Sequence, residues 1–152
     1  MLRTRLADAL KDSLRAKQER RVGTIRLILA ALKSKDIDAR PSGNKDGIAE
    51  PEILQMMNGM IKQRRESIEM FEKGNRPELA KQEAEEIEII QSFMPKQMDE
   101  AETAAAVKDA IAQSGAASVK DMGKVMAVLK EKYTGVMDFS KVSGVVKQQL
   151  GA

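Results

Sequence analysis

A chain of 152 residues, 42% hydrophobic and 32% charged, is long enough for one domain or two small ones and too apolar to be disordered. It contains no cysteine and no histidine, which excludes disulfides, thiolate zinc sites, imidazole acid–base catalysis and Ser-His-Asp triads. No apolar run approaches the roughly 18 residues of a membrane span, and the charged N-terminus does not match a secretory signal. We therefore expect a cytoplasmic protein that does not contact a membrane.

The net charge of +3 hides an uneven distribution along the chain. Residues 1–35 hold ten Lys and Arg against three Asp and Glu, a surplus of +7. Residues 36–95 hold eight against thirteen, or −5, and residues 117–152 hold six against three, or +3. All six basic residues of the last stretch are lysine. The chain thus alternates between basic, acidic and basic stretches.

Apolar residues at spacings of three and four predict two helices in the first part of the chain. The first covers about residues 2–18 and the second about 22–38, with the sequence ERRVG between them. The segment ARPSGNKDGI, residues 39–48, gathers Pro, Gly, Ser, Asn and Asp and therefore predicts a loop.

A third helix is predicted from Pro51, which suits a first turn, to about Lys73. The sequence GNRPE then stops this helix and starts the next. Gly74 is expected at the end of one helix, Asn75 as the cap of the next, and Pro77 in its first turn.

The fourth helix, about residues 76–92, is acidic and ends where Pro95 disfavours helical geometry at Met94. We place the domain boundary there. Beyond it, three short helices are predicted from their capping residues, since Asp99, Ser118 and Asp138 each precede an apolar periodic segment.

No segment alternates strictly between apolar and polar residues, so no strand is expected. The sequence predicts an all-α protein. An N-terminal four-helix bundle-like domain, residues 1–95, is followed by a small three-helix C-terminal module, residues 96–152.

The lysines of the C-terminal module are the first candidate site for binding nucleic acid. Several lysines on one surface supply salt-dependent, sequence-independent affinity for phosphates. They are Lys120, Lys124, Lys130 and Lys132 on one predicted helix and Lys141 and Lys147 on the next. The alternative is the ordinary coat of a solvated helix, and the residues alone favour it, because no arginine or stacking platform accompanies them.

Arg20 and Arg21 are further candidates, within a basic cluster over residues 15–26. Cations at the C-terminal end of a helix are also stabilised by the helix dipole, without any ligand. Arg64 lies on the apolar side of its helix, where it is expected to join two helices or to pair with Glu83.

Gly123 and Gly144 fall inside predicted helices, where glycine costs about 1 kcal/mol relative to alanine. We interpret both as positions of close packing against a neighbouring helix. The alternative at Gly123 is a nucleic-acid backbone near the helix N-terminus, where amide groups favour anions.

No catalytic, metal or cofactor site is predicted. The dense carboxylates, Glu83, Glu85, Glu86 and Glu88, lack the histidine that metal-binding helical bundles add, so a solvated face is expected. Serine, threonine and lysine side chains have no evident base and orienting partner nearby in the sequence. No phosphate loop of the Walker or dinucleotide type is present.

Two long segments resemble the GatB/YqeY family, and most closely its free-standing YqeY-like proteins. They are KQRRESIEMFEKGNRPELAKQEAEEIEIIQSFMPKQM and the pair DMGKVMAVLKEKYTG and DFSKVSGVVKQQL. The most specific parts are residues 62–67, 74–79, 93–97 and 122–126, and the likeness covers essentially the whole chain. The insert at residues 40–49 varies freely in such proteins.

The resemblance implies the helical bundle and three-helix module described above. The same pair forms the tail of the B subunit of the glutamine-dependent aspartyl/glutamyl-tRNA amidotransferase, where it contacts tRNA. For this chain the resemblance implies tRNA or another RNA as partner, with Lys120, Lys124, Lys130 and Lys132 as contacts. It also implies an association with carbon–nitrogen ligase activity that uses glutamine as amide donor, although no nucleophile with activating partners is evident for stand-alone catalysis.

The leading hypothesis is therefore an RNA-binding accessory protein that acts through the basic surface of residues 117–152, with help from residues 15–26. A second hypothesis is a protein-interaction module that docks on an amidotransferase or another protein through a methionine-rich groove. Its lining would be Met56, Met57, Met60, Met122 and Met126. A third, a direct role in glutamine-dependent amide transfer, predicts glutaminase activity, which we expect to be absent.

Overall fold

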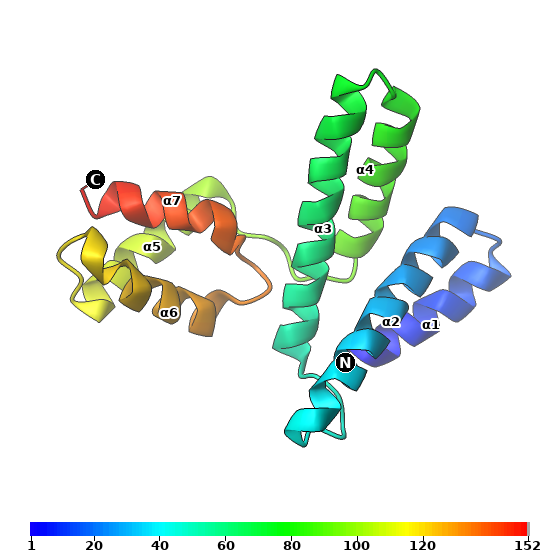
Figure 1. The fold of residues 1–152 in the computed structure, drawn as a ribbon, viewed down its shortest axis with the longest axis horizontal. Helices are drawn as coiled ribbons and strands as arrows, with labels where there is room; N and C mark the ends of the chain where they lie inside the picture. Colours follow the sequence, from blue (N-terminus) through cyan, green and yellow to red (C-terminus); the bar gives the residue numbers. More distant parts are fainter. Residues whose placement is uncertain (152) are drawn as a thin grey trace. The chain divides into compact units, whose positions relative to one another are not determined.

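The computed structural model describes residues 1–151, and over these residues it contains α-helices, 3₁₀ turns and loops but no strand (Figure 1). The predicted all-α class is confirmed. The helices are α1 (Leu2–Arg15), α2 (Glu19–Ala39), α3 (Glu50–Lys73), α4 (Pro77–Gln91), α5 (Glu100–Ser114), α6 (Met122–Tyr133) and α7 (Phe139–Gln149), with 3₁₀ turns η1 (Arg40–Ser42) and η2 (Val119–Asp121). The chain divides into two compact units, Met1–Met94 and Pro95–Ala152.

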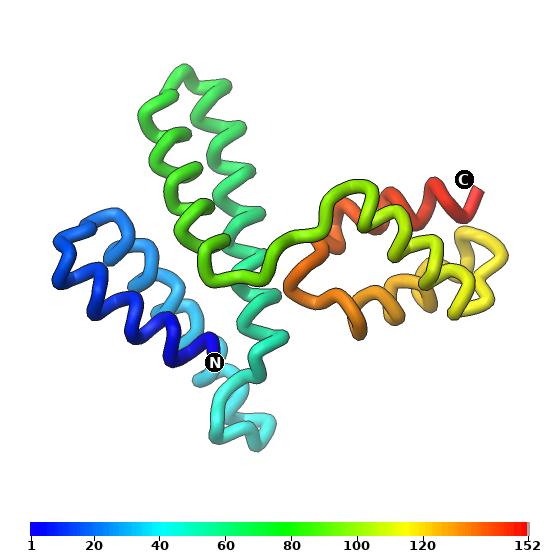
Figure 2. Tube along the Cα trace, turned by 180° about the vertical axis from the view of Figure 1, so that it is seen from behind, coloured from blue at the N-terminus to red at the C-terminus, as the bar shows by residue number. Residues whose placement is uncertain are grey.

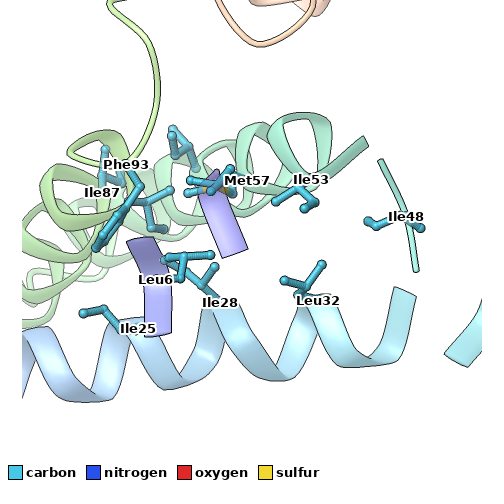
Figure 3. Close-up of a cluster of buried hydrophobic side chains, with 12 residues drawn as sticks. Leu6, Ile25, Ile28, Leu32, Ile48, Ile53, Met57, Ile87 and Phe93 are labelled. Atoms are coloured by element: carbon cyan, nitrogen blue, oxygen red, sulfur yellow. The ribbon is translucent and has the colours of Figure 1, made fainter. Parts of the chain in front are cut away.

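The N-terminal unit consists of two helical hairpins, α1 with α2 and α3 with α4, and α2 also packs against α4 (Figures 1 and 2). Its shared core is aliphatic apart from Phe93, as Figure 3 shows. Leu6, Ile28 and Met57 are fully buried and come from α1, α2 and α3 in turn. Burying each such side chain contributes roughly 1.5–3 kcal/mol. Neither hairpin can bury its apolar stripe alone, so the two hairpins fold against each other.

The break between the first two helices lies earlier than the sequence indicated. ERRVG was expected to separate them, but it forms the first turns of α2, and Val22 within it is buried. The chain reverses instead at Lys17, whose φ of 56° lies in the left-handed region. The charged residues in ERRVG conceal the point at which the apolar stripe of α2 begins.

The second hairpin turn differs from its prediction by one residue. Gly74 follows the end of α3 and Pro77 opens α4, as predicted. Asn75 does not cap α4, because it takes a φ of 56° and reverses the chain, while Arg76 occupies the cap position. Asparagine is one of the few residues other than glycine that enter the left-handed region readily.

The C-terminal unit packs α5, α6 and α7 around a second core, in which Val107, Val125 and Val146 are fully buried. Two predicted caps are confirmed. The carboxylate of Asp99 accepts from the backbone N–H of Glu102 at 2.7 Å, and Asp138 accepts from the N–H of Ser140 at 3.1 Å.

The start of the middle helix of this unit was predicted less well. Ser118 makes no side-chain cap, and the turn η2 intervenes before α6. The carboxylate of Asp121 accepts instead from the N–H of Ala117 at 3.0 Å, which lowers the pKa of Asp121. Among the described residues, no helix combines the length and the apolar character needed to cross a bilayer.

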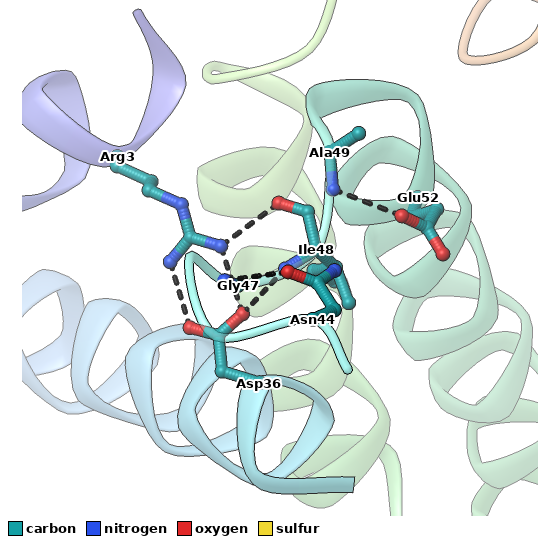
Figure 4. A network of polar contacts seen from close by, with 7 residues as sticks. All are labelled: Arg3, Asp36, Asn44, Gly47, Ile48, Ala49 and Glu52. Carbon is teal, nitrogen blue, oxygen red and sulfur yellow. Dashed lines mark hydrogen bonds and ion pairs between the residues drawn. The ribbon is translucent and has the colours of Figure 1, made fainter. Parts of the chain in front are cut away.

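A polar clasp at one end of the N-terminal unit joins α1, α2 and the loop before α3 (Figure 4). Arg3 donates through Nη1 and Nη2 to the two oxygens of Asp36, both at 2.8 Å, and through Nη2 to the carbonyl of Ile48 at 2.9 Å. Asp36 also accepts from the N–H of Ile48 at 2.9 Å. The loop that the sequence presented as a variable insert therefore supplies two backbone groups to a network that ties the hairpins together.

Gly47 is required by the geometry of this clasp. Its φ is +94°, and a Cβ at this position would lie 2.7 Å from Arg3 Nη2 and 2.7 Å from Asp36 Oδ1. Both atoms are held by the ion pair, so a side chain at residue 47 would have to displace it. Beyond this turn, Ile48 is buried in the shared core.

Replacing Asp36 by asparagine should lower the free energy of unfolding by about 1 kcal/mol, because the bidentate ion pair becomes a neutral contact. We keep the figure low because the side chain of Arg3 is 40% exposed, so solvent screens the pair. Urea denaturation at neutral pH measures the change. The matched control is Asp38→Asn, an exposed carboxylate two residues away, which should stay within about 0.5 kcal/mol of the wild type.

The contribution of Asp36 should also depend on pH. The hydrogen bonds from Arg3, and then the N–H of Ile48, lower the pKa of Asp36 from 3.8 to about 2. Because the folded-state pKa is the lower one, the stabilisation is complete above pH 3.8 and is lost as the pH falls towards 2. The stability difference between wild type and Asp36→Asn should therefore shrink over this window. A difference that stays constant down to pH 2 would contradict the assignment.

Candidate nucleic-acid interface

All six candidate lysines are exposed in the C-terminal unit. Lys120 was expected on the same helix as Lys124, but it lies in the turn η2 that precedes α6. The other lysines lie as predicted on two helices: Lys124, Lys130 and Lys132 on α6, and Lys141 and Lys147 on α7. Their distribution over η2, α6 and α7 follows from the amphipathic pattern, which directs Val125 and Leu129 into the core.

The six lysines do not form one row. At about 100° per residue, Lys130 and Lys132 leave α6 on opposite flanks, about 160° apart. Lys132 extends towards α5, where its Nζ lies 2.6 Å from Oε1 of Gln113. Lys120, in η2, and Lys124, in the first turn of α6, are four residues apart, about one helical turn. One nucleic-acid strand could therefore contact a subset of the six.

Carboxylates neutralise little of this lysine charge. Lys124 Nζ lies 3.9 Å from Asp121 Oδ1, at the limit of an ion pair, and the Lys124 side chain is 71% exposed. Asp121 is already occupied by the N–H of Ala117. Lys120, Lys130 and Lys147 make no ion pair within residues 1–151. The ammonium groups of these lysines remain available to a ligand.

Arg20 and Arg21 are used by the N-terminal unit itself. Arg20 Nε lies 3.3 Å from Glu85 Oε2 and so joins α2 to α4. The guanidinium of Arg21 lies over the ring of Phe93, 5.1 Å from its centroid, in a cation–π contact. Both arginines could reach a phosphate only by weakening these contacts, which distinguishes them from the lysines.

Arg64 joins α3 to α4, but not through the predicted partner. The expectation of Glu83 is wrong: Arg64 Nε donates to Glu86 Oε2 at 2.9 Å, and Arg64 Nη1 donates to the carbonyl of Met60 at 3.2 Å. Arg64 is buried, at 9% exposure, and all its buried polar atoms have partners. Burial, and then the nearby charge of Glu86, raise the pKa of Glu83.

The carboxylates of α4 are thus partly engaged in ion pairs and not merely solvated, because Glu85 and Glu86 hold Arg20 and Arg64. No cluster of three or more metal-ligating side chains occurs within the part of the chain that the structure describes.

The close-packing interpretation of Gly123 and Gly144 is wrong. Both glycines are exposed, and a Cβ built on either would find no heavy atom within 4 Å. Nothing within the described part of the chain requires a glycine at these two helix positions.

The methionines of the expected groove belong to two different units. Met57 is fully buried, and Met56 and Met60 pack against the core of the N-terminal unit. Met122 and Met126 pack against the separate core of the C-terminal unit. These side chains fill gaps in two aliphatic cores, as flexible thioethers commonly do.

Sequence reasoning missed a cleft of about 650 Å³ on the N-terminal unit. It is lined by Glu19, Arg20, Gly23, Thr24, Leu27 and Glu86. Two signals in the sequence could have indicated it: Gly23 lies inside a helical pattern, and Leu27 lies off the apolar stripe. Neither signal specifies which helix forms the opposite wall.

The fold and its surface define an all-helical protein of two units, with an exposed lysine-bearing surface on the second. The chain belongs to the YqeY family, because the sequence model of the family described as "Yqey-like protein" matches residues 3–150. This family membership agrees with the resemblance seen in the sequence.

Curated relatives come from yeasts. The chain is 40% identical over 85 residues to "Altered inheritance of mitochondria protein 41, mitochondrial" of Lachancea thermotolerans, which covers 56% of this chain and 43% of that protein. The protein of the same name in Eremothecium gossypii is 37% identical over 89 residues, 59% of this chain and 46% of that protein. The matched part of the chain thus spans less than half the length of these relatives.

The names of these relatives contradict the expected cytoplasmic location, since they describe mitochondrial proteins. That expectation rested on the lack of an apolar span and of a secretory signal in the sequence. Neither feature distinguishes the cytoplasm from the interior of a mitochondrion.

Replacing Gly123 or Gly144 by alanine should raise the free energy of unfolding by about 0.5–1 kcal/mol for each change. Alanine loses less backbone entropy than glycine in a helix, and the surrounding space is open. Thermal denaturation of the single and double variants measures the gain, which should be additive. A loss of stability would show that one of these glycines packs more closely than the structure indicates.

Proposed function

We propose that this YqeY-like protein is an RNA-binding accessory protein that contacts tRNA through the lysines of its C-terminal unit. The observation that carries the proposal is the set of exposed lysines, of which Lys120, Lys130 and Lys147 make no ion pair among the described residues and Lys124 lies at the 3.9 Å limit of one with Asp121. A surface of this kind binds phosphates and releases counterions without reading the base sequence.

The contacts are assigned first to Lys120 and Lys124. Lys132 and Lys130 lie further along α6, about 80° and 120° around the helix from Lys124, and Lys141 and Lys147 lie on α7, so these four add to the long-range field more than to one contact surface. Arg20 and Arg21 contribute least, since Glu85 and Phe93 already hold them. In this proposal, only a few of the lysines contact tRNA phosphates directly.

An accessory role beside a glutamine-dependent tRNA amidotransferase is the biological context that the family resemblance suggests. In this proposal the chain presents or retains tRNA, and the amide chemistry belongs to another protein. Lysine contacts alone supply affinity and orientation but no nucleophile.

Titration of the purified full chain with unfractionated tRNA tests the proposal. The logarithm of the binding constant should fall with the logarithm of salt concentration, with a slope of roughly −2 to −4, as expected for three or four phosphate contacts. The double change Lys120→Gln with Lys124→Gln should weaken binding and reduce the magnitude of that slope by roughly 1.5.

The matched control is Lys11→Gln with Lys33→Gln, which removes the same charge from exposed positions on α1 and α2. It should leave the slope nearly unchanged. The proposal fails if tRNA does not bind even at low salt, or if the control weakens binding as much as the Lys120 and Lys124 pair does.

A further inference from the structure

Two places in the sequence have an aspartate or asparagine followed by glycine: Asp46–Gly47, in the loop before α3, and Asn58–Gly59, inside α3. At such pairs a chain closes a succinimide ring most readily, because glycine has no side chain to shield its amide nitrogen. The two pairs have opposite surroundings. An α-helix holds each interior amide on the carbonyl four residues earlier, so the nitrogen of Gly59 is not free to attack. Residues 44–47 belong to no helix.

The carboxylate of Asp46 is free to turn towards the peptide bond that follows it. Asp46 is exposed and makes no hydrogen bond or ion pair within residues 1–151. The clasp also disfavours every residue except glycine at position 47, since a Cβ there would lie 2.7 Å from both Arg3 Nη2 and Asp36 Oδ1. The geometry that ties the hairpins together therefore keeps a reactive pair directly beside the clasp.

Hydrogen bonds restrain this pair in the folded loop. The N–H of Gly47 donates to Oδ1 of Asn44 at 3.1 Å (Figure 4). The next residue, Ile48, is anchored twice, through its N–H to Asp36 and through its carbonyl to Arg3. The nitrogen of Gly47 must leave Asn44 before it can reach a carboxyl carbon. Only the opened loop can react, so the rate depends on how often the loop opens.

We propose that Asp46–Gly47 is a site of spontaneous isoaspartate formation, restrained by the hydrogen bond to Asn44 and by the clasp. The nitrogen of Gly47 bonds to Cγ of Asp46, and the carboxyl hydroxyl leaves as water with the amide proton. Water then opens the five-membered ring. Attack at the main-chain carbonyl carbon of Asp46 breaks its bond to Gly47, so the chain continues through Cγ as isoaspartate. Attack at Cγ restores aspartate.

The product lengthens the main chain by one carbon directly before the clasp. The backbone then passes through Cβ and Cγ of residue 46, and the former main-chain carboxyl becomes the charged side group. Gly47 lies too close to Arg3 and Asp36 to absorb this change, so Ile48 moves away from both. Isomerisation therefore releases the clasp while the composition and the charge of the chain stay the same. This inference concerns the N-terminal unit and does not depend on RNA binding.

Ageing of the purified full chain at neutral pH tests the proposal. Peptide mapping locates isoaspartate, and methyl transfer by a purified protein isoaspartate methyltransferase counts it. The folded chain should accumulate isoaspartate at residue 46 and keep Asn58 intact. In urea the order should reverse, because an asparagine–glycine pair closes the ring faster than an aspartate–glycine pair once no helix holds its amide.

Variants separate the restraints from the reaction. Asn44→Ala removes the acceptor of the Gly47 amide and should raise the rate at residue 46 about fivefold, the effect of one lost hydrogen bond. Asp36→Asn weakens the clasp and should raise the rate about two- to fivefold. Asp38→Asn, an exposed control outside the clasp, should react like the wild type. Asp46→Glu should stop the reaction, since glutamate has to close a larger ring.

The stability of the aged chain tests the consequence for the clasp. Wild type rich in isoaspartate should have a urea midpoint close to that of fresh Asp36→Asn, because both lack the clasp.

Four results would contradict the proposal. Folded wild type without isoaspartate at residue 46, after the urea-unfolded chain has fully converted, would refute the site. Faster reaction at Asn58 in the folded chain would show that the fold does not select residue 46. Equal rates in wild type, Asn44→Ala and Asp36→Asn would refute the restraint. An unchanged urea midpoint after ageing would show that the clasp survives isomerisation.

Discussion

The N-terminal unit depends on one shared aliphatic core, because neither of its helical hairpins can bury an apolar stripe by itself. Leu6, Ile28 and Met57 from three helices converge there, and Phe93 provides the one aromatic ring. The clasp of Arg3 and Asp36 fixes one end of the assembly. The hairpins diverge towards the other end, so the cleft between α2 and α4 is a consequence of how the core closes.

The two units use charge differently. In the N-terminal unit most of the arginines that sequence reasoning singled out are bound within the fold: Arg20 holds Glu85, Arg21 lies on Phe93 and Arg64 holds Glu86. Arginine suits such contacts because its planar fork donates in fixed directions and stacks on rings. In the C-terminal unit the cations are lysines, whose flexible stems keep the charge in solvent. A count of basic residues treats these two situations alike, although only the second leaves charge for a partner.

The sequence predicts well whatever local chemistry decides. Gly74 after α3, Pro77 at the start of α4 and the caps at Asp99 and Asp138 follow from backbone rules that operate within a few residues. It predicts poorly what distant packing decides. Glu83 and Glu86 lie about one turn apart, and only the crossing of α3 and α4 selects Glu86 as the partner of Arg64. The cleft is even harder to predict from the sequence, because residues 19–27 and Glu86 come together only when the hairpins have folded.

Glycine inside a helix carries no functional meaning by itself, and this chain shows why. Gly23, Gly59, Gly123 and Gly144 all stand in open space, so none is explained by contacts within the described residues. Their shared cost in helix stability therefore cannot identify a binding site. Gly23 differs because its neighbours differ: a half-exposed leucine lies one turn away, and an acidic helix faces it across a cleft. The role of a glycine within a helix therefore depends on the surface around it, and at Gly23 that surface forms only when α2 and α4 pack together.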